Sequence, residues 1–276
     1  MKKAILVVSF GTTYKETLKL TIGKIEDEIK NNYKEFEVRR AFTAHMIIKK
    51  LKDRDGLVVP TPEEALNKLY EEGYEEVIVQ PLHIIPGEEF QYIRLVVEKF
   101  EKEKKFKSIK IGRPALHFHG SEENPDDYET FIEAIKDIIP KDKTMLFMGH
   151  GSNHPANSAF VALQSVFKYM QLDNVYIGTV EGYPTIDMII DILKRDGIKD
   201  VKLAPLMLVA GDHAINDMAS DEEDSWKSIL KSNGIEVELY MHGLGEIDSF
   251  RKIYINHIQD VIDNKYLNLG DTKKMA

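Results

Sequence analysis

The sequence predicts an α/β protein made of two similar parallel-sheet domains. Short apolar runs alternate with longer amphipathic runs along the whole chain, and the second half repeats the order of the first. The length of 276 residues suits two domains, at about 150 residues each. With 43% apolar residues and little glycine or proline, the chain can build ordinary packed cores.

The first half alternates strands with helices. We expect strands at residues 3–9, 36–43, 76–83 and 108–114, and helices at 17–31, 61–72 and 88–104. The run KAILVVS at 3–9 is apolar on both faces, which is typical of a buried parallel strand. Leu18, Ile22 and Ile25 recur at helical spacing. Pro62 and Gly73 mark the start and end of the second helix.

The second half follows the same plan. We expect strands at residues 144–148, 174–180, 201–209 and 235–241, and helices at 156–170, 185–196, 221–233 and 247–264. Residues 71–90 (EEGYEEVIVQPLHIIPGEEF) align with 195–214 (RDGIKDVKLAPLMLVAGDHA) at a constant offset, matching glycines and a proline. A repeat this long indicates duplicated domains rather than a solenoid.

The domain boundary is expected in a stretch rich in acidic residues. We predict a first lobe at residues 1–120, a crossover segment at 121–143 with its own helix at 128–139, and a second lobe at 144–276 that ends in the last helix. Two such lobes should leave a cleft between them. Ligands of these folds bind outside the carboxyl ends of the strands.

Composition excludes several functions. The chain has no cysteine, so thiolate nucleophiles, iron–sulfur clusters and cysteine-ligated zinc are ruled out. The net charge of −9 counts against nucleic acid as a partner. No run approaches the ~20 apolar residues of a membrane span, and the N-terminus lacks a signal-peptide pattern. We therefore expect a soluble, cytoplasmic protein.

Three polar residues follow three successive strands of the second half. His150, Glu181 and His213 each come after a predicted strand and each lies beside glycine. Parallel strands place their carboxyl ends at one edge, so these side chains should converge. One such histidine would more simply serve loop hydrogen bonding, but three in register favour a metal site. Two imidazoles and a carboxylate suit cobalt, iron, nickel or zinc.

Other catalytic scaffolds are missing from the sequence. It contains no G-x-G-x-x-G, no Walker A sequence and no G-x-S-x-G elbow, which leaves nucleotide binding and serine hydrolysis without their usual motifs. His45 and His83 lie at the ends of strands of the first half, Glu89 aligns with His213 in the repeat, and all three are expected near the cleft. His154 is a weaker metal candidate, because Gly151 and Pro155 argue for a loop there.

Six motifs in order resemble the anaerobic-pathway sirohydrochlorin cobaltochelatases of the class II chelatase family. They are ILVVSFGTTY, TAHMI, VQPLHIIPGEE, MGHGSNHPAN, TVEGYP and LMLVAGDHAINDMA, and they span nearly the whole chain. The resemblance implies two flavodoxin-like domains and ATP-independent insertion of Co²⁺ into sirohydrochlorin or precorrin-2. It also implies that His150, Glu181 and His213 are the metal-binding and catalytic residues, with no cofactor beyond the substrate metal.

The implied substrate is an octacarboxylate, although the protein itself is acidic. Binding must then rely on local positive charge and backbone N–H groups. The basic candidates are Arg39, Arg40, Lys49, Lys50, Arg94 and Arg113. Our substrate-binding candidates are Phe10, Gly11, Thr12, Thr13, His45, His83, Glu89, Gly151 and Ser152.

Two alternatives stay open from the sequence. One is the same reaction with Fe²⁺ or Ni²⁺, since imidazole and carboxylate accept all three ions. The other is a non-catalytic protein that binds a tetrapyrrole or a metal. The expected partners are sirohydrochlorin and a divalent metal ion, without nucleic acid or membrane. The sequence is compatible with a homo-oligomer and does not set its size.

Overall fold

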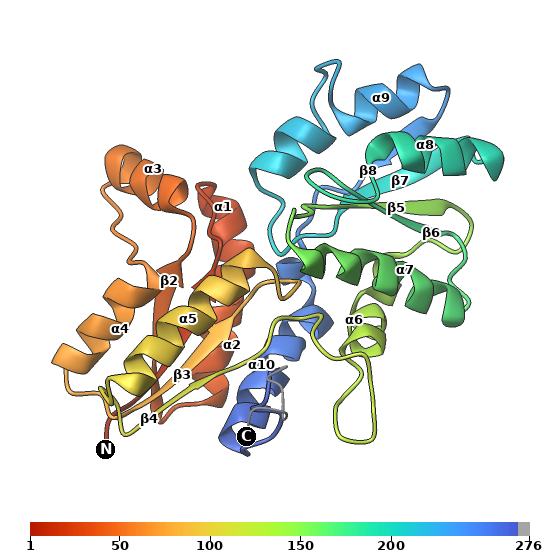
Figure 1. The fold of residues 1–276 in the computed structure, drawn as a ribbon. Coiled ribbons are helices and arrows are strands. Elements are labelled where there is room, and N and C mark those ends of the chain that lie inside the picture. Colours follow the sequence, from red (N-terminus) through yellow and green to blue (C-terminus); the bar gives the residue numbers. More distant parts are fainter. Residues whose placement is uncertain (270–276) are drawn as a thin grey trace. The chain divides into compact units, whose positions relative to one another are not determined.

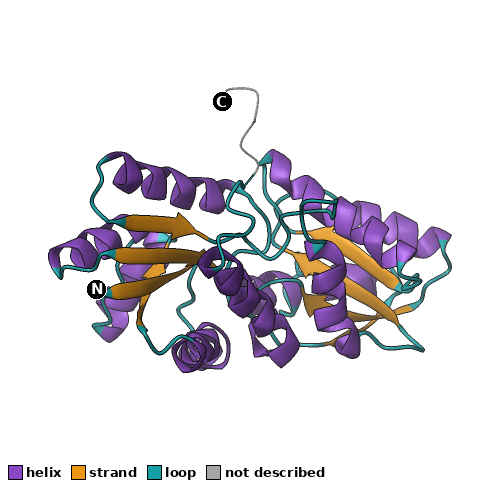
Figure 2. Ribbon diagram, turned by 90° about the horizontal axis from the view of Figure 1, so that it is seen from below, coloured by secondary structure: helices purple, strands orange, loops and turns teal. Residues whose placement is uncertain are grey.

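Each half of the chain forms a four-stranded parallel sheet in the computed structural model, which describes residues 1–269 (Figure 1). The chain divides into two compact units. Unit 1 comprises Met1–Gly11, Ile25–Asp126 and the described residues from Lys252 on, and unit 2 comprises Thr12–Lys24 and Asp127–Arg251. Helices lie on both faces of each sheet (Figure 2), so the predicted α/β fold class is confirmed.

The sheet of unit 1 has the strand order β2-β1-β3-β4. Its strands are β1 (Lys3–Ser9), β2 (Phe36–Phe42), β3 (Glu76–Pro81) and β4 (Ser108–Ile111). The central strand β1 pairs with β2 from Lys3 opposite Phe36 and with β3 from Lys3 opposite Glu76. Since β1 is flanked by strands on both edges and by helices on both faces, its residues from Ala4 to Val8 are at most 1% exposed.

The helices around this sheet are amphipathic. They are α2 (Lys24–Asn32), α3 (His45–Asp55), α4 (Pro62–Glu71), α5 (Glu88–Lys102) and α10 (Asp248–Ile262). Thr61 and Glu64 form a capping box at the start of α4, with Pro62 in its first turn. Helices α4 and α5 lie over one face of the sheet (Figure 1), where Leu66 and Phe100 join Leu6 in one buried cluster.

The sheet of unit 2 has the equivalent order, β6-β5-β7-β8. Its strands are β5 (Thr144–Gly149), β6 (Val175–Thr179), β7 (Asp200–Pro205) and β8 (Glu236–Leu239). Its helices are α1 (Lys15–Leu18), the π-helical turn Lys19–Gly23, α6 (Asp127–Ile135), α7 (Ser158–Tyr169), α8 (Ile186–Arg195) and α9 (Trp226–Ser232). Shorter turns are Lys136–Ile138, Pro155–Asn157, Ala214–Met218 and Leu244–Glu246.

The two sheets confirm the internal repeat found in the sequence. Gly73 and Gly197 both end a helix with positive φ, at 78° and 72°. The residues after β3 and β7 make the same hydrogen bond, because Leu82 N–H donates to Val8 C=O and Leu206 N–H donates to Met148 C=O. Residues that align in the sequence repeat therefore have the same backbone conformation or hydrogen bond in both units.

Helix α3 was not predicted. Its apolar residues Ile47, Ile48 and Leu51 have helical spacing, but they are few, they lie among charged residues, and Ala44 at the start offers no capping side chain. Leu51 is its only buried residue, so most of the helix is solvated. None of the helices within residues 1–269 is both long and apolar enough to cross a membrane.

The unit boundaries differ from the predicted lobes in three places. The last helix was expected in the second lobe, but from Lys252 on it belongs to unit 1. Its Tyr254 hydroxyl donates to Leu82 C=O at 3.0 Å, which ties it to the end of β3. Residues 12–24 belong to unit 2, although they precede most of unit 1 in sequence. The segment predicted as a crossover, 121–143, is divided between the units at Asp126.

Candidate metal centre

The three residues predicted to converge lie together at the carboxyl edge of the unit 2 sheet. His150 directly follows β5, Glu181 lies two residues beyond β6, and His213 follows β7 through a longer loop. One ligand atom from each of the three lies within 4.8 Å of the others. This is the one group of three potential metal ligands found within residues 1–269.

The two imidazoles are close and nearly perpendicular. The ring centroids of His150 and His213 are 4.5 Å apart, with an interplanar angle of 88°. The Nδ1 atom of His150 lies 4.0 Å from Oε2 of Glu181. The side chains of His150, Glu181 and His213 are 38%, 57% and 31% exposed, so an ion can reach them from solvent. Such a group can hold a divalent ion of the first transition series.

Backbone hydrogen bonds join the loops that carry His150 and Glu181. Val180 N–H donates to Gly149 C=O at 3.0 Å, and Glu181 N–H donates to His150 C=O at 2.8 Å. Gly151 has a φ of 82°, and a Cβ there would lie 2.7 Å from the backbone nitrogen of Gly182. The close approach of these two loops therefore requires glycine at position 151.

Asn157 also links the two loops and was not predicted. Its Oδ1 accepts from Ser152 N–H at 3.0 Å, and its Nδ2 donates to Tyr183 C=O at 2.7 Å. A lone asparagine between a proline-containing turn and a helix gives no signal of this role in the sequence. The backbone N–H of Ser152, predicted as a substrate contact, is thus used inside the protein.

The predicted residues Thr12 and Thr13 lie in unit 2, where both are buried. A Cβ on Gly211 would lie 3.4 Å from the hydroxyl oxygen of Thr12, so this segment lies against the loop that carries His213. The neighbouring Tyr14 donates its hydroxyl to Asp212 at 3.1 Å. Residues 12–14 therefore contact the loop that carries His213, within the same unit.

The other predicted contacts belong to unit 1 and are not among the three grouped ligands. Phe10 is 43% exposed, Gly11 has a φ of 100°, and His45 begins α3 on the surface. Glu89 lies in the first turn of α5. His83 is partly buried, and burial lowers the pKa of its imidazole to about 4.

His154 has a structural role in the described chain. Its Nδ1 accepts from Ala156 N–H at 3.1 Å and caps the turn Pro155–Asn157. It also lines a hollow of about 720 Å³ that borders the metal centre, together with Ser152, Asn153, Val161, Glu181 and Tyr183. The hollow lies entirely within unit 2, so the exposed carboxylate of Glu181 opens onto a space large enough for part of an organic ligand.

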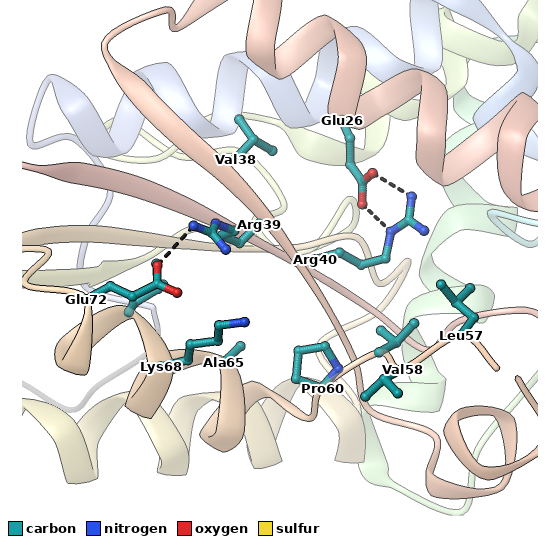
Figure 3. A pocket seen from close by; sticks show the side chains of 12 residues that line it. Glu26, Val38, Arg39, Arg40, Leu57, Val58, Pro60, Ala65, Lys68 and Glu72 are labelled. Carbon is teal, nitrogen blue, oxygen red and sulfur yellow. Dashed lines mark hydrogen bonds and ion pairs between the residues drawn. The ribbon is translucent and has the colours of Figure 1, made fainter. Parts of the chain in front are cut away.

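The arginines proposed to hold substrate carboxylates are paired within unit 1. Arg40 binds Glu26 through two hydrogen bonds of 2.7 and 2.6 Å, and Arg39 donates to Glu72 at 3.0 Å. Figure 3 shows both pairs at the sides of a hollow of about 340 Å³. Arg94 pairs with Glu98, and Arg113 pairs with Asp260. Lys49 and Lys50 instead lie exposed on α3.

Comparisons with known proteins identify the family of this chain. The family model described as cobalt chelatase (CbiK) matches residues 3–263. A sirohydrochlorin cobaltochelatase of Salmonella typhimurium (strain LT2) is 39% identical over 266 residues, covering 95% of this chain and 97% of that protein. Sirohydrochlorin cobaltochelatase CbiKC of Nitratidesulfovibrio vulgaris (strain Hildenborough) is 32% identical, covering 93% of this chain and 89% of that protein.

Solved structures share the fold at lower sequence identity. SirB from Bacillus subtilis with Fe³⁺ superposes with a TM-score of 0.61 and 16% identity, covering 96% of this chain and 97% of that one. Its similarity supports the two-sheet α/β architecture.

Proposed function

Because the chain belongs to the cobalt chelatase (CbiK) family, we propose that it is a chelatase that inserts Co²⁺ into sirohydrochlorin. The observation that carries the proposal is the group formed by His150, Glu181 and His213 in unit 2. The reaction exchanges two pyrrole N–H protons for one divalent ion. It is neither a redox nor a group-transfer reaction, so we expect no cofactor beyond the substrate metal.

The centre suits an ion that must be bound and then released. Two imidazoles and one carboxylate bind cobalt without the thiolates that hold structural ions tightly. The site is partly exposed, which allows the ion to enter and leave. We assign His150 and His213 as the ligands that present Co²⁺ to the macrocycle. Glu181, the most exposed of the three, completes the site and accepts protons from the pyrrole nitrogens.

Replacing either histidine tests the proposal. His150→Ala and His213→Ala should each reduce insertion at least 100-fold, because each removes one of three ligands. The measurement is the absorbance change of sirohydrochlorin mixed with Co²⁺, Fe²⁺ or Ni²⁺ in turn. His242→Ala is the matched control, since His242 is a surface histidine of unit 2 that also pairs with a carboxylate.

The outcomes separate the alternatives. Faster insertion of Fe²⁺ or Ni²⁺ than of Co²⁺ would assign a different metal to the same centre. No acceleration over the uncatalysed rate with any of the three ions would favour a binding protein. Near-wild-type turnover in the double variant His150→Ala/His213→Ala would refute the assigned ligands.

A further inference from the structure

The two imidazoles of the metal centre are held by acceptors of different charge. Nδ1 of His150 lies 3.0 Å from the backbone carbonyl of Gly151. Nδ1 of His213 lies 2.6 Å from Oδ2 of Asp217. A carbonyl and a carboxylate only accept hydrogen bonds, so each ring carries its proton on Nδ1 and its lone pair on Nε2. Both rings therefore present the same nitrogen to a metal, but only the ring of His213 is hydrogen-bonded to a charged acceptor, since the carboxylate nearest Nδ1 of His150 is that of Glu181 at 4.0 Å.

Asp217 reaches His213 because both lie on one short helical turn. His213 is the residue before the π-helical turn Ala214–Met218, and Asp217 follows it by four residues. The neighbouring Asp212 accepts a hydrogen bond from Tyr14 instead. Asp217 is not one of the three grouped ligands, and its side chain is 44% exposed. Within residues 1–269, the side chain of Asp217 is thus hydrogen-bonded to a proposed metal ligand.

We propose that Asp217 is a positioning residue that makes His213 the stronger of the two imidazole donors, an inference that rests on the proposed function. A carboxylate that accepts from the far ring nitrogen fixes the ring orientation and raises the electron density of the ligating nitrogen. A neutral carbonyl, as at His150, does this less strongly. The bound Co²⁺ is then anchored mainly by His213, and His150 is the ligand it gives up more easily to the macrocycle.

A similar pair elsewhere in unit 2 provides a control. Nδ1 of His242 lies 2.8 Å from Oε2 of Glu246, again four residues apart. No third ligand is grouped with this pair in the described part of the chain. A histidine–carboxylate pair four residues apart can therefore serve local stability alone, and the role of Asp217 must show in metal binding.

The test is a titration of the whole chain with Co²⁺ alone, followed by its visible absorption. Asp217→Asn removes the charge and keeps the size, and Asp217→Ala removes the acceptor as well. We expect cobalt affinity to fall about 10-fold in the first and up to about 100-fold in the second. The absorption bands of bound Co²⁺ should also change shape. Asp217→Glu should restore part of the affinity, and Glu246→Gln should bind within twofold of wild type.

Insertion kinetics give a second readout. The KM for Co²⁺ should rise in Asp217→Asn, while kcat at saturating Co²⁺ stays within a few-fold of wild type, because the reacting atoms are unchanged. Equal cobalt affinity in wild type and both Asp217 variants, with affinity lost in His213→Ala, would overturn the positioning role alone. Wild-type affinity in His213→Ala would overturn the metal site on which the inference rests.

Discussion

The histidines of this protein differ in the groups that surround their ring nitrogens. Both ring nitrogens of His83 are buried without a hydrogen-bond partner in the described chain. Two other histidines are used for structure, since His257 bonds to Arg113 C=O and His154 caps a turn. The two histidines of the metal centre differ from these, because they are grouped with the carboxylate of Glu181.

His83 should make stability depend on pH. Its pKa is about 4 in the folded protein and about 6.5 when unfolded. Between these values the unfolded chain binds more protons, so the free energy of unfolding falls as pH drops from 6.5 to 4 and is constant below 4. The loss is at most about 3 kcal/mol.

The variant His83→Leu removes this titration and two unsatisfied polar atoms. We expect it to be at least as stable as wild type at pH 7, with a smaller loss of stability between pH 6.5 and 4. Urea denaturation across this range measures the difference. His45→Leu, at an exposed histidine of the same unit, should keep the wild-type slope. If the free energy of unfolding changed with pH equally in His83→Leu and wild type, the low pKa assigned to His83 would be wrong.

At the scale of elements, the metal centre depends on how closely two loops approach. The loop after β5 carries His150 and the loop after β6 carries Glu181, and backbone hydrogen bonds join them. Asn157 adds one more hydrogen bond between the same loops, from its Nδ2 to Tyr183 C=O, and a second bond, from Ser152 N–H to its Oδ1, within the first loop. The separation of the first two ligands is therefore set by the backbone.

Gly151→Ala should disturb this arrangement. The new Cβ would lie 2.7 Å from Gly182 N and 2.8 Å from Thr179 Cβ, in addition to the cost of a positive φ. We expect cobalt affinity to fall at least 10-fold. Gly197→Ala is the control, because it also has a positive φ but no atom within 4 Å of its Cβ.

The control should lose only about 1 kcal/mol of stability and keep wild-type cobalt affinity. Cobalt titration and urea denaturation of both variants make the comparison. Equal cobalt affinity in Gly151→Ala and wild type would show that the loop contact does not set the ligand spacing.

At the scale of the molecule, each unit is assembled from segments that are distant in sequence. The start of the chain forms the central strand of unit 1, and the last helix returns to the same unit. Tyr254 of α10 is fully buried, and its hydroxyl donates to Leu82 C=O. Unit 1 is therefore completed only when the end of the chain is in place.

Tyr254→Phe tests this closure. It leaves the carbonyl of Leu82 without this donor, which should cost about 1–2 kcal/mol. The midpoint of urea denaturation should fall accordingly. Tyr169→Phe, at a tyrosine that is 78% exposed, should leave the midpoint unchanged. Equal midpoints for wild type and Tyr254→Phe would mean that α10 is not held through this bond.

The sequence by itself determined the order of the strands along the chain, the internal repeat and the three residues that lie together in unit 2. These features depend on local periodicity and on the rule that parallel strands end at one edge. Helix α3 was not predicted, because its apolar residues are few and Ala44 at its start offers no capping side chain.

Only the tertiary structure decided which side chains pair and which segments share a unit. Arg40 forms an ion pair with Glu26, and Asp217 accepts a hydrogen bond from His213. The last helix joins unit 1, although it follows unit 2 in sequence. Which side chains pair, and which unit a segment joins, depend on distances between residues that are far apart in the chain. For His213 and Asp217 the pairing depends on the conformation of the turn between them. Composition and periodicity carry no information on such distances, because the same polar residue can face solvent or a partner.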